Sequence, residues 1–327
     1  MKLGERSLAE LCAALRERPE LGLKRDIQLA ASVFPRAAAS AWFPGGRILN
    51  GDDTAALPDA DGYTLFAAEG LRPEFVADEP WFAGFCSVMV NLNDVAAMGG
   101  RPWAVVDVLF MGSGDNQRVL EGLRDASEAF GVPVVGGHTA RVTSGTALAV
   151  AVLGRARRLI SSHHARPGQA LLLAVDLRGK FRGRSGNFDA ATTASPEALR
   201  RNLSILPELA EAELCRAGKD VSMAGLCGSL LMLLETSGVG GWLDLDAVPA
   251  PPGVEPERWL GAFPSFGFVL ATETEKAAEV TARFEAAGVA CRSVGGIDDS
   301  RVLTLCAGGK RAVYADLAES GLTGFGP

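Results

Sequence analysis

The stretch Val-Asn-Leu-Asn-Asp-Val-Ala-Ala-Met-Gly-Gly-Arg-Pro, at residues 90–102, carries the strongest structural signal in the chain. Apolar side chains recur at helical spacing over residues 81–98 on nearly every side, which predicts a helix buried all round. The Gly-Gly pair and the proline would end this helix. Asn91 and Asp94 share one face of it because they lie three residues apart. A buried carboxylate is costly unless it is paired, hydrogen-bonded or bound to a cation, so Asp94 is either a bridging core residue or a metal ligand.

The composition is typical of a globular protein with two domains. The chain has 327 residues, 48% of them hydrophobic and 22% charged, with a formal net charge of −7. This charge, with no dominant basic face, argues against nucleic acid as a partner. No apolar run approaches the roughly 20 residues of a membrane span, and the first 21 residues lack the apolar core of a signal peptide. The six scattered cysteines are typical of buried thiols in a reducing compartment, so we expect a cytoplasmic protein without a membrane partner.

Strand-like and helical patterns alternate along the chain, which predicts an α/β or α+β fold. In the first half we expect helices at 7–18, 25–39 and 116–130, a loop at 42–50, and strands at 63–69, 104–110, 132–135 and 146–153. In the second half we expect strands at 170–175, 266–271, 289–294 and 302–306, and helices at 195–216, 224–237 and 274–287. The Gly-, Arg- and Pro-containing stretch between the halves predicts a hinge, and hence domains at residues 1–157 and residues 165–327.

Two loops in the first half could carry chemistry. Asp52 and Asp53 are adjacent carboxylates that repel each other, and a divalent cation would remove that repulsion; the alternative is an ordinary polar turn. Gly-Gly-His-Thr at residues 136–139 follows a strand, where glycines let backbone N–H groups approach an anion. The alternative there is a tight turn with a solvated histidine.

Two stretches of the second half are also candidates. Asp220 and Ser222 precede an apolar helix, whose start they could cap or where a phosphate could bind. The stretch 177–189 carries Lys180, Arg182 and Arg184, and is either a solvated hinge or a loop that closes over phosphate or substrate. No motif decides the function alone.

The order of these motifs resembles the aminoimidazole ribonucleotide synthetase (PurM-like) superfamily, which includes thiamine-monophosphate kinase, selenophosphate synthetase and the hydrogenase-maturation carbamoyl dehydratase. The resemblance runs from about residue 51 to residue 271. It implies a two-domain fold in which the N-terminal domain closes a shared barrel with that of a second subunit, as a homodimer, with a C-terminal α/β domain behind it. It also implies that ATP and Mg²⁺ bind between the domains.

The resemblance implies roles for individual residues. The metal carboxylates would be Asp52, Asp53, Asp94 and, where the kinase carries an aspartate on a strand, Glu69. Asp94 and Asp220 would act in catalysis. The residues that would contact the cofactor are Asn91, Gly136, Gly137, His138, Thr139 and Ser222.

The chain departs from the known members at several positions. Thiamine-monophosphate kinase has Asp where this chain has His138, and another Asp where it has Met223, so fewer metal carboxylates are available here. A histidine in this turn is similar to selenophosphate synthetase. That enzyme also uses an N-terminal cysteine or selenocysteine and a lysine in a glycine-rich loop. The candidates in residues 1–50 are Cys12, in a helix pattern, and Lys24, so selenide activation is not expected.

We therefore expect ATP- and Mg²⁺-dependent phosphoryl transfer to a small molecule, or phosphate activation of it. The acceptor and the choice between ADP and AMP as product cannot be derived from the residues. The alternative is a non-catalytic nucleotide-binding subunit or scaffold, which the departures at His138 and Met223 favour. Neither a dinucleotide-binding G-x-G-x-x-G after a strand nor a P-loop motif is present.

Overall fold

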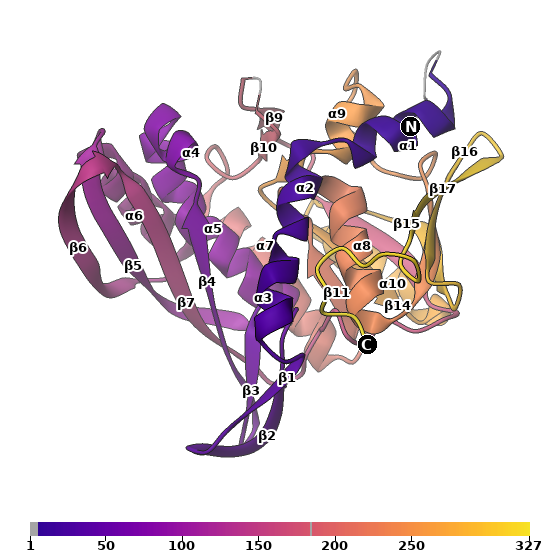
Figure 1. The fold of residues 1–327 in the computed structure, drawn as a ribbon, viewed down its shortest axis with the longest axis horizontal. Coiled ribbons are helices and arrows are strands. Elements are labelled where there is room, and N and C mark those ends of the chain that lie inside the picture. Colours follow the sequence, from indigo (N-terminus) through magenta and orange to yellow (C-terminus); the bar gives the residue numbers. More distant parts are fainter. Residues whose placement is uncertain (1–5, 184) are drawn as a thin grey trace. The chain divides into compact units, whose positions relative to one another are not determined.

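The computed structural model describes residues 6–183 and 185–327, except for the side chains of residues 43–45. The chain forms two compact units of mixed α/β structure, and this fold class was predicted. We name the units by their main sheets. The five-stranded unit comprises Thr54–Leu159 and Ala194–Glu208, and the seven-stranded unit comprises Met1–Asp53, Ile160–Thr193 and Leu209–Pro327 (Figure 1).

The five-stranded unit is built around the predicted buried helix. Its strands have the order β3 (Ala55–Asp59), β4 (Gly62–Leu71), β7 (Ala147–Ala156), β5 (Arg101–Ser113) and β6 (Val134–Gly145). All neighbouring pairs are antiparallel except β5 and β6, which are parallel. Its helices are α4 (Pro73–Asp78), α5 (Pro80–Ala97) and α6 (Asn116–Phe130), and the first part of α7 (Pro196–Glu211) also belongs to it.

Helix α5 packs against β4 and β7 on one side and against α6 on another. The two helices come very close, because a Cβ atom added to Gly84 would lie 2.1 Å from the carbonyl oxygen of Val119. A Cβ atom on Gly122 would likewise lie 2.0 Å from the carbonyl oxygen of Trp81. Two glycines therefore set the α5–α6 contact, and this holds the polar face of α5 in place.

The face of the five-stranded sheet opposite α5 is apolar and largely exposed. Side chains alternate along β7, with Leu148, Val150 and Val152 buried and the intervening positions more open. The exposed large apolar side chains on strands β4, β5 and β7 include Phe66, Val106, Val108, Phe110 and Leu153.

The seven-stranded unit has the strand order β11 (Ala217–Asp220), β14 (Gly267–Thr272), β8 (Ala170–Val175), β15 (Ala290–Asp298), β12 (Gly240–Asp244), β16 (Val302–Ala307) and β17 (Lys310–Asp316). Its larger helices are α1 (Leu8–Arg16), α8 (Gly225–Ser237) and α10 (Ala277–Ala286), with α10 preceded by a 3₁₀ turn (Thr274–Lys276). Shorter elements are α2 (Pro19–Arg25), α3 (Ile27–Val33), α9 (Pro256–Leu260), the hairpin β1 (Ala37–Ser40) and β2 (Phe43–Leu49), and a small sheet of β9 (Lys180–Phe181), β10 (Asn187–Asp189) and β13 (Phe263–Pro264).

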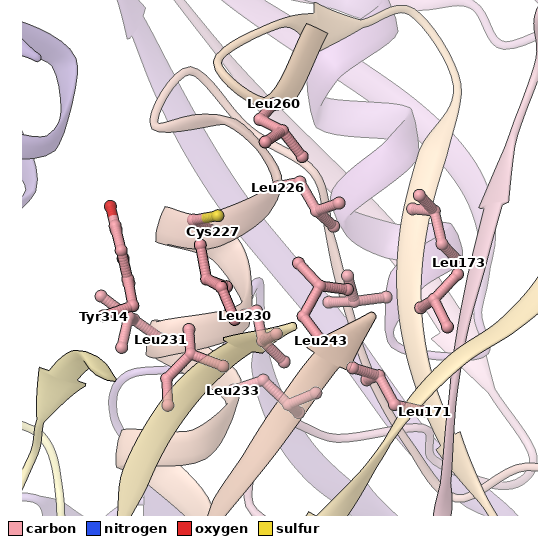
Figure 2. Packing of buried hydrophobic residues seen from close by; sticks show 14 of the residues in the cluster. Leu171, Leu173, Leu226, Cys227, Leu230, Leu231, Leu233, Leu243, Leu260 and Tyr314 are labelled. Carbon is pink, nitrogen blue, oxygen red and sulfur yellow. The ribbon is translucent and has the colours of Figure 1, made fainter. Parts of the chain in front are cut away.

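The core of this unit lies between α8 and the sheet. Leu171 and Leu173 of β8 point toward the leucines of α8, among them Leu230 and Leu233 (Figure 2). The alternate residue Leu172 is also buried, and α10 packs against β8. Because β8 is covered on both faces, it has the continuous apolar sequence that was predicted for a strand at 170–175.

Two local predictions near the N-terminus were wrong. The helix predicted over residues 25–39 is mostly the short helix α3, which ends at Val33 because Pro35 disfavours helical geometry in the residue before it; strand β1 follows from Ala37. The loop predicted at 42–50 is mostly β2.

Helix α1 packs on β16 and β17, where Arg16 donates a hydrogen bond to the carbonyl of Tyr314 at 3.2 Å. The domain limits of residues 1–157 and 165–327 stay a prediction.

No helix within residues 6–183 and 185–327 is both long enough and apolar enough to span a membrane.

Candidate functional site

A buried cluster of charged groups lies at the end of strand β11 in the seven-stranded unit. Lys219 forms an ion pair with Asp53, and the two side chains are 8% and 2% exposed. The backbone N–H of Asp220 donates to Asp53 Oδ2 at 3.3 Å, and Lys219 Nζ lies 3.9 Å from Asp220 Oδ1. A carboxylate oxygen of Asp53 and one of Asp220 lie within 4.8 Å of each other. The chain thus brings together two acidic residues that are 167 positions apart.

The electrostatics of this cluster are dominated by excess negative charge. Burial raises the pKa of Asp53 to about 7; the charge of Lys219 opposes this rise, and Asp220 and Asp52 add to it. Burial alone would lower the pKa of Lys219, but the carboxylates around it, Asp53 first, raise it above its ordinary value. Three carboxylates surround one ammonium group, so the cluster can accept a further cation.

Asp52 has a different environment from Asp53. Its carboxylate accepts hydrogen bonds from the hydroxyl of Ser161 and from the backbone N–H groups of Ser162 and Asp53, the last two at 3.1 Å. These bonds fix the 51–53 loop against residues 161–162. A metal-binding role for Asp52 stays a prediction.

Ser222 lies in the turn between β11 and α8. Its hydroxyl oxygen is buried and has no hydrogen-bond partner among the described residues, while its N–H donates to Ser229 Oγ at 2.9 Å. Of the two alternatives for Asp220 and Ser222, helix capping is wrong, because α8 starts only at Gly225, after Ala224 as N-cap, and no side chain caps it. An unsatisfied buried hydroxyl needs a partner, which a bound phosphate or a water molecule would supply.

The polar face predicted on the buried helix is present in α5. Asn91 is fully buried and Asp94 is 6% exposed. The Asn91 side-chain nitrogen donates to the carbonyl of Ser87 at 2.8 Å, and its Oδ1 has no partner in the described part of the chain. Helix α5 thus presents a buried polar face made of two of the predicted site residues.

The turn predicted at residues 136–139 is not a turn. Gly136, Gly137, His138 and Thr139 lie within β6, in parallel register with β5, and all four are exposed. Gly137 packs closely on Asp107, since a Cβ on it would lie 2.4 Å from Asp107 Oδ1, whereas a Cβ on Gly136 would make only an ordinary contact at 4.0 Å. The ring of His138 packs edge-on against Phe110, with 6.2 Å between centroids. Cofactor binding by these four residues stays a prediction.

Two carboxylates of the five-stranded sheet lie in one row. Glu69 on β4 pairs with Val150 on β7, which in turn pairs with Asp107 on β5. Paired positions project to the same face, so Glu69 and Asp107 share a face at roughly 10 Å backbone separation. Burial raises the pKa of Asp107. Asp107 was missed at the sequence level, although an aspartate inside the apolar run 104–110 is the signal that could have found it.

The basic stretch 177–189 forms the β9–β10 hairpin. Arg182 pairs with Asp189 at 3.2 Å, and Lys180 is exposed. The guanidinium of Arg258 lies 4.0 Å from the centroid of the Phe181 ring. Arg184 lies outside the described residues. Whether this hairpin contacts phosphate or substrate stays a prediction.

Comparison with known proteins now identifies the family. Residues 51–156 match the family described as AIR synthase related protein, N-terminal domain, and residues 167–306 match its C-terminal domain. The chain belongs to the AIR synthase-related family. This confirms the superfamily resemblance and the predicted two-domain PurM-like fold.

Relatives of this AIR synthase-related chain match it over different shares of their length. An uncharacterized protein of Synechocystis sp. is 44% identical over 320 residues, which are 97% of this chain and 98% of the relative. An uncharacterized protein of Methanocaldococcus jannaschii is 33% identical over 248 residues, or 75% and 76% of the two chains. Phosphoribosylformylglycinamidine synthase subunit PurL of Haloquadratum walsbyi is 28% identical over 233 residues, 61% of this chain and 32% of PurL.

Solved structures show the same fold at low sequence identity. Thermotoga maritima PurL complexed with ATP has a TM-score of 0.74 and 22% identity, covering 96% of this chain and 52% of PurL. A HypE–HypF complex matches at 0.64, with 16% identity and coverage of 80% and 92%. ThiL complexed with AMPPCP and TMP matches at 0.61, with 18% identity and coverage of 80% and 89%. The chain therefore spans about half the length of the PurL structures, and structural neighbours of it bind ATP.

Proposed function

We propose that this AIR synthase-related protein binds ATP together with Mg²⁺ and uses the phosphate of ATP on a small-molecule substrate, by phosphoryl transfer or by activation of an oxygen. The observation that carries the proposal is the pair Asp53 and Asp220, whose oxygens lie within 4.8 Å beside a buried lysine. The ATP complex of T. maritima PurL and the AMPPCP complex of ThiL support a nucleotide as ligand.

The donor set fits Mg²⁺. This ion prefers oxygen ligands, and the carboxylates of Asp53 and Asp220 would supply them. We propose that Asp53 and Asp220 hold the cation, which would neutralise charge on the phosphate oxygens. The superfamily resemblance adds Asp94 as a candidate metal carboxylate. Glu69 and Asp52 remain further candidates from the superfamily resemblance.

The protein's own groups would position the phosphates. Phosphoryl transfer needs alignment and charge neutralisation more than covalent chemistry. We propose that the Lys219 ammonium and the unpartnered Ser222 hydroxyl contact phosphate oxygens, since the first is the cation of the cluster and the second needs a hydrogen-bond partner. The unpartnered Oδ1 of Asn91 can accept a hydrogen bond from a metal-bound water or from the nucleotide.

A second candidate is a nucleotide-binding protein that does not turn ATP over. The Lys219–Asp53 ion pair favours it, because an ammonium group competes with a divalent cation for the same carboxylate. The HypE–HypF complex provides an example of this fold assembled with a partner protein. Turnover assays with small-molecule acceptors separate the two candidates.

We also propose that the protein is a homodimer. The exposed apolar face of the five-stranded sheet supports this, because contiguous apolar surface on a sheet marks an interface. All six cysteines are free thiols, which supports the cytoplasm as its compartment.

The experiment that tests the function compares Asp220→Asn with the matched control Asp299→Asn, a change at an exposed aspartate. Calorimetry of ATP binding with and without Mg²⁺ should show Mg²⁺-dependent binding by the wild type. Asp220→Asn should weaken it at least about tenfold, as expected for loss of a metal-site group, and Asp299→Asn should leave it unchanged. Asp94→Asn should abolish Mg²⁺-dependent turnover with the fold intact. A wild type that binds no ATP, or an Asp220→Asn variant that binds normally, would refute the proposal.

A further inference from the structure

The loop that carries Asp52 and Asp53 is covered by the last residues of the sequence. Gly51 has φ of +101°, and a Cβ added to it would lie 2.6 Å from the Cβ of Phe325. Phe325 is 8% exposed. The residue directly before the acidic pair is therefore in tight contact with residues 321–327, which we call the tail segment.

A buried carboxylate on α8 anchors the tail segment. Glu235 is 4% exposed, and its Oε2 accepts hydrogen bonds from the backbone N–H and the hydroxyl of Thr323, both at 2.8 Å. Its Oε1 accepts a third bond, from the N–H of Gly324 at 3.0 Å. Figure 1 shows the yellow tail segment running across α8. Because a buried charge must be compensated, these three donors fix the tail segment in one position relative to α8.

The same end of α8 is also connected to Asp52 through hydrogen bonds of Ser162. The hydroxyls of Thr236 and Ser237 both donate to the carbonyl of Ser162, the first at 2.8 Å. The N–H of Ser162 in turn donates to the Asp52 carboxylate. These contacts therefore form a closed ring. The acidic loop contacts residues 161–162, which contact the end of α8. Glu235 of α8 then binds the tail segment, and the tail segment contacts Gly51.

Resting on the proposed function, we propose that the tail segment is a positioning strap for the acidic loop, with Glu235 and Phe325 as its positioning residues. Neither residue would touch the cation or the nucleotide. Glu235 anchors the tail segment to α8, and Phe325 packs against Gly51. These two contacts keep the loop in the position where the Asp53 oxygens lie close to those of Asp220. Releasing either contact removes the support on the Gly51 side, while Asp52 stays bound to residues 161–162 and Asp53 to Lys219 and Asp220.

The test uses two strap variants, a conservative variant and a structural control in the full chain. Glu235→Gln replaces an accepting oxygen with a donating NH₂, so a strap donor loses its partner. Phe325→Ala removes the ring from Gly51, whereas Phe325→Leu keeps an apolar contact. Phe284→Leu, at a fully buried position of α10, perturbs the core of the same unit away from the strap.

Binding of ATP in the presence of Mg²⁺ is measured by calorimetry, and amide hydrogen exchange is measured over residues 51–53. Glu235→Gln and Phe325→Ala should weaken binding about tenfold and speed exchange in the loop. Phe325→Leu should restore most of the affinity. Phe284→Leu should lower the unfolding midpoint with unchanged affinity.

Unchanged affinity and exchange in both strap variants would overturn the inference while the proposed function stands. An equal loss of affinity in Phe284→Leu would also overturn it, because the effect would then be general destabilisation. If the wild type binds neither ATP nor Mg²⁺, the proposed function and this inference fail together.

Discussion

The ammonium group of Lys219 on β11 forms an ion pair with Asp53, a residue 166 positions earlier in the chain, and both side chains are less than one-tenth exposed. Asp220 lies next to this pair without being its principal partner. One buried cation is thus shared among more negative charge than it can neutralise. The stability of the cluster depends on that imbalance, and so would the proposed binding of a second cation.

Removing the lysine should destabilise the protein strongly. In Lys219→Met the Asp53 carboxylate is left buried without its cation, which costs about 3–5 kcal/mol in comparable buried pairs. Urea denaturation should show a loss of this size in the free energy of unfolding, and Mg²⁺ should restore part of it by binding the native state. Lys310→Met, at an exposed position of β17, is the control and should change stability little. A loss below about 1 kcal/mol would mean that the ion pair does not hold the cluster together.

Stability should fall as the pH rises from about 4 to about 7. The pKa of Asp53 is raised from 3.8 to about 7, so within this window the native state binds more protons than the unfolded chain. The free energy of unfolding then decreases with pH, by at most about 1.4 kcal/mol per pH unit for one group. His163, whose pKa is lowered by burial, acts with the opposite sign.

Comparison with Asp53→Asn isolates the contribution of Asp53 to this pH dependence. Since His163 contributes to both proteins, urea denaturation across the same pH range should show a flatter or rising profile in the variant. Identical slopes in the two proteins would contradict the raised pKa of Asp53.

The close contact of α5 and α6 should make Gly84 intolerant of a methyl group. Alanine is intrinsically favoured over glycine in a helix by about 1 kcal/mol, but its Cβ here would lie 2.1 Å from the carbonyl oxygen of Val119. The helices must separate, so Gly84→Ala should lose about 1–3 kcal/mol. Gly22→Ala is the matched control, because nothing lies within 4 Å of its added Cβ in α2, and it should gain about 0.5–1 kcal/mol. Thermal unfolding of both variants shows whether each substitution raises or lowers the unfolding midpoint. Equal shifts of the midpoint in the two variants would disprove the packing argument.

The proposed dimer predicts that a charge on the open sheet face separates the subunits. Val108→Asp places an unpaired carboxylate on the apolar face of β5, where burial against a second copy becomes unfavourable. Light scattering coupled to size exclusion should report a dimer for the wild type and a monomer for this variant. Val313→Asp, at a more exposed position on β17, should remain dimeric. A monomeric wild type would rule the dimer out.

Elements with strong local signals were predicted well from the sequence. Helix α6 has the predicted limits, Asn116–Phe130, because an acidic N-cap begins it and Gly131 in the left-handed conformation ends it. Strand β8 also has the predicted limits, since a strand buried on both faces needs a continuous apolar run. Strands β11 and β12 escaped prediction because they are short and glycine-containing, and only pairing with neighbours from distant parts of the chain makes them strands.

The candidate site likewise has features that local sequence signals predicted and features that they did not. Burial of Asn91 and Asp94 followed from the all-round apolar pattern of their helix, and the sequence motifs identified the family. The conformation of residues 136–139 was misjudged because a Gly-Gly pair signals a turn locally, whereas parallel pairing with β5 extends it into a strand.

By itself, the sequence determined the buried polar helix, the family and the acidic residues available for a cation, because periodicity, caps and motif order are local properties of the chain. Only the tertiary structure decided that Lys219 neutralises Asp53, that Asp52 binds residues 161–162 instead of standing free, and that Glu235 anchors the tail segment over Gly51. Such contacts join residues dozens to hundreds of positions apart. Which charge meets which partner depends on how the sheet and helices pack, and no local pattern records that.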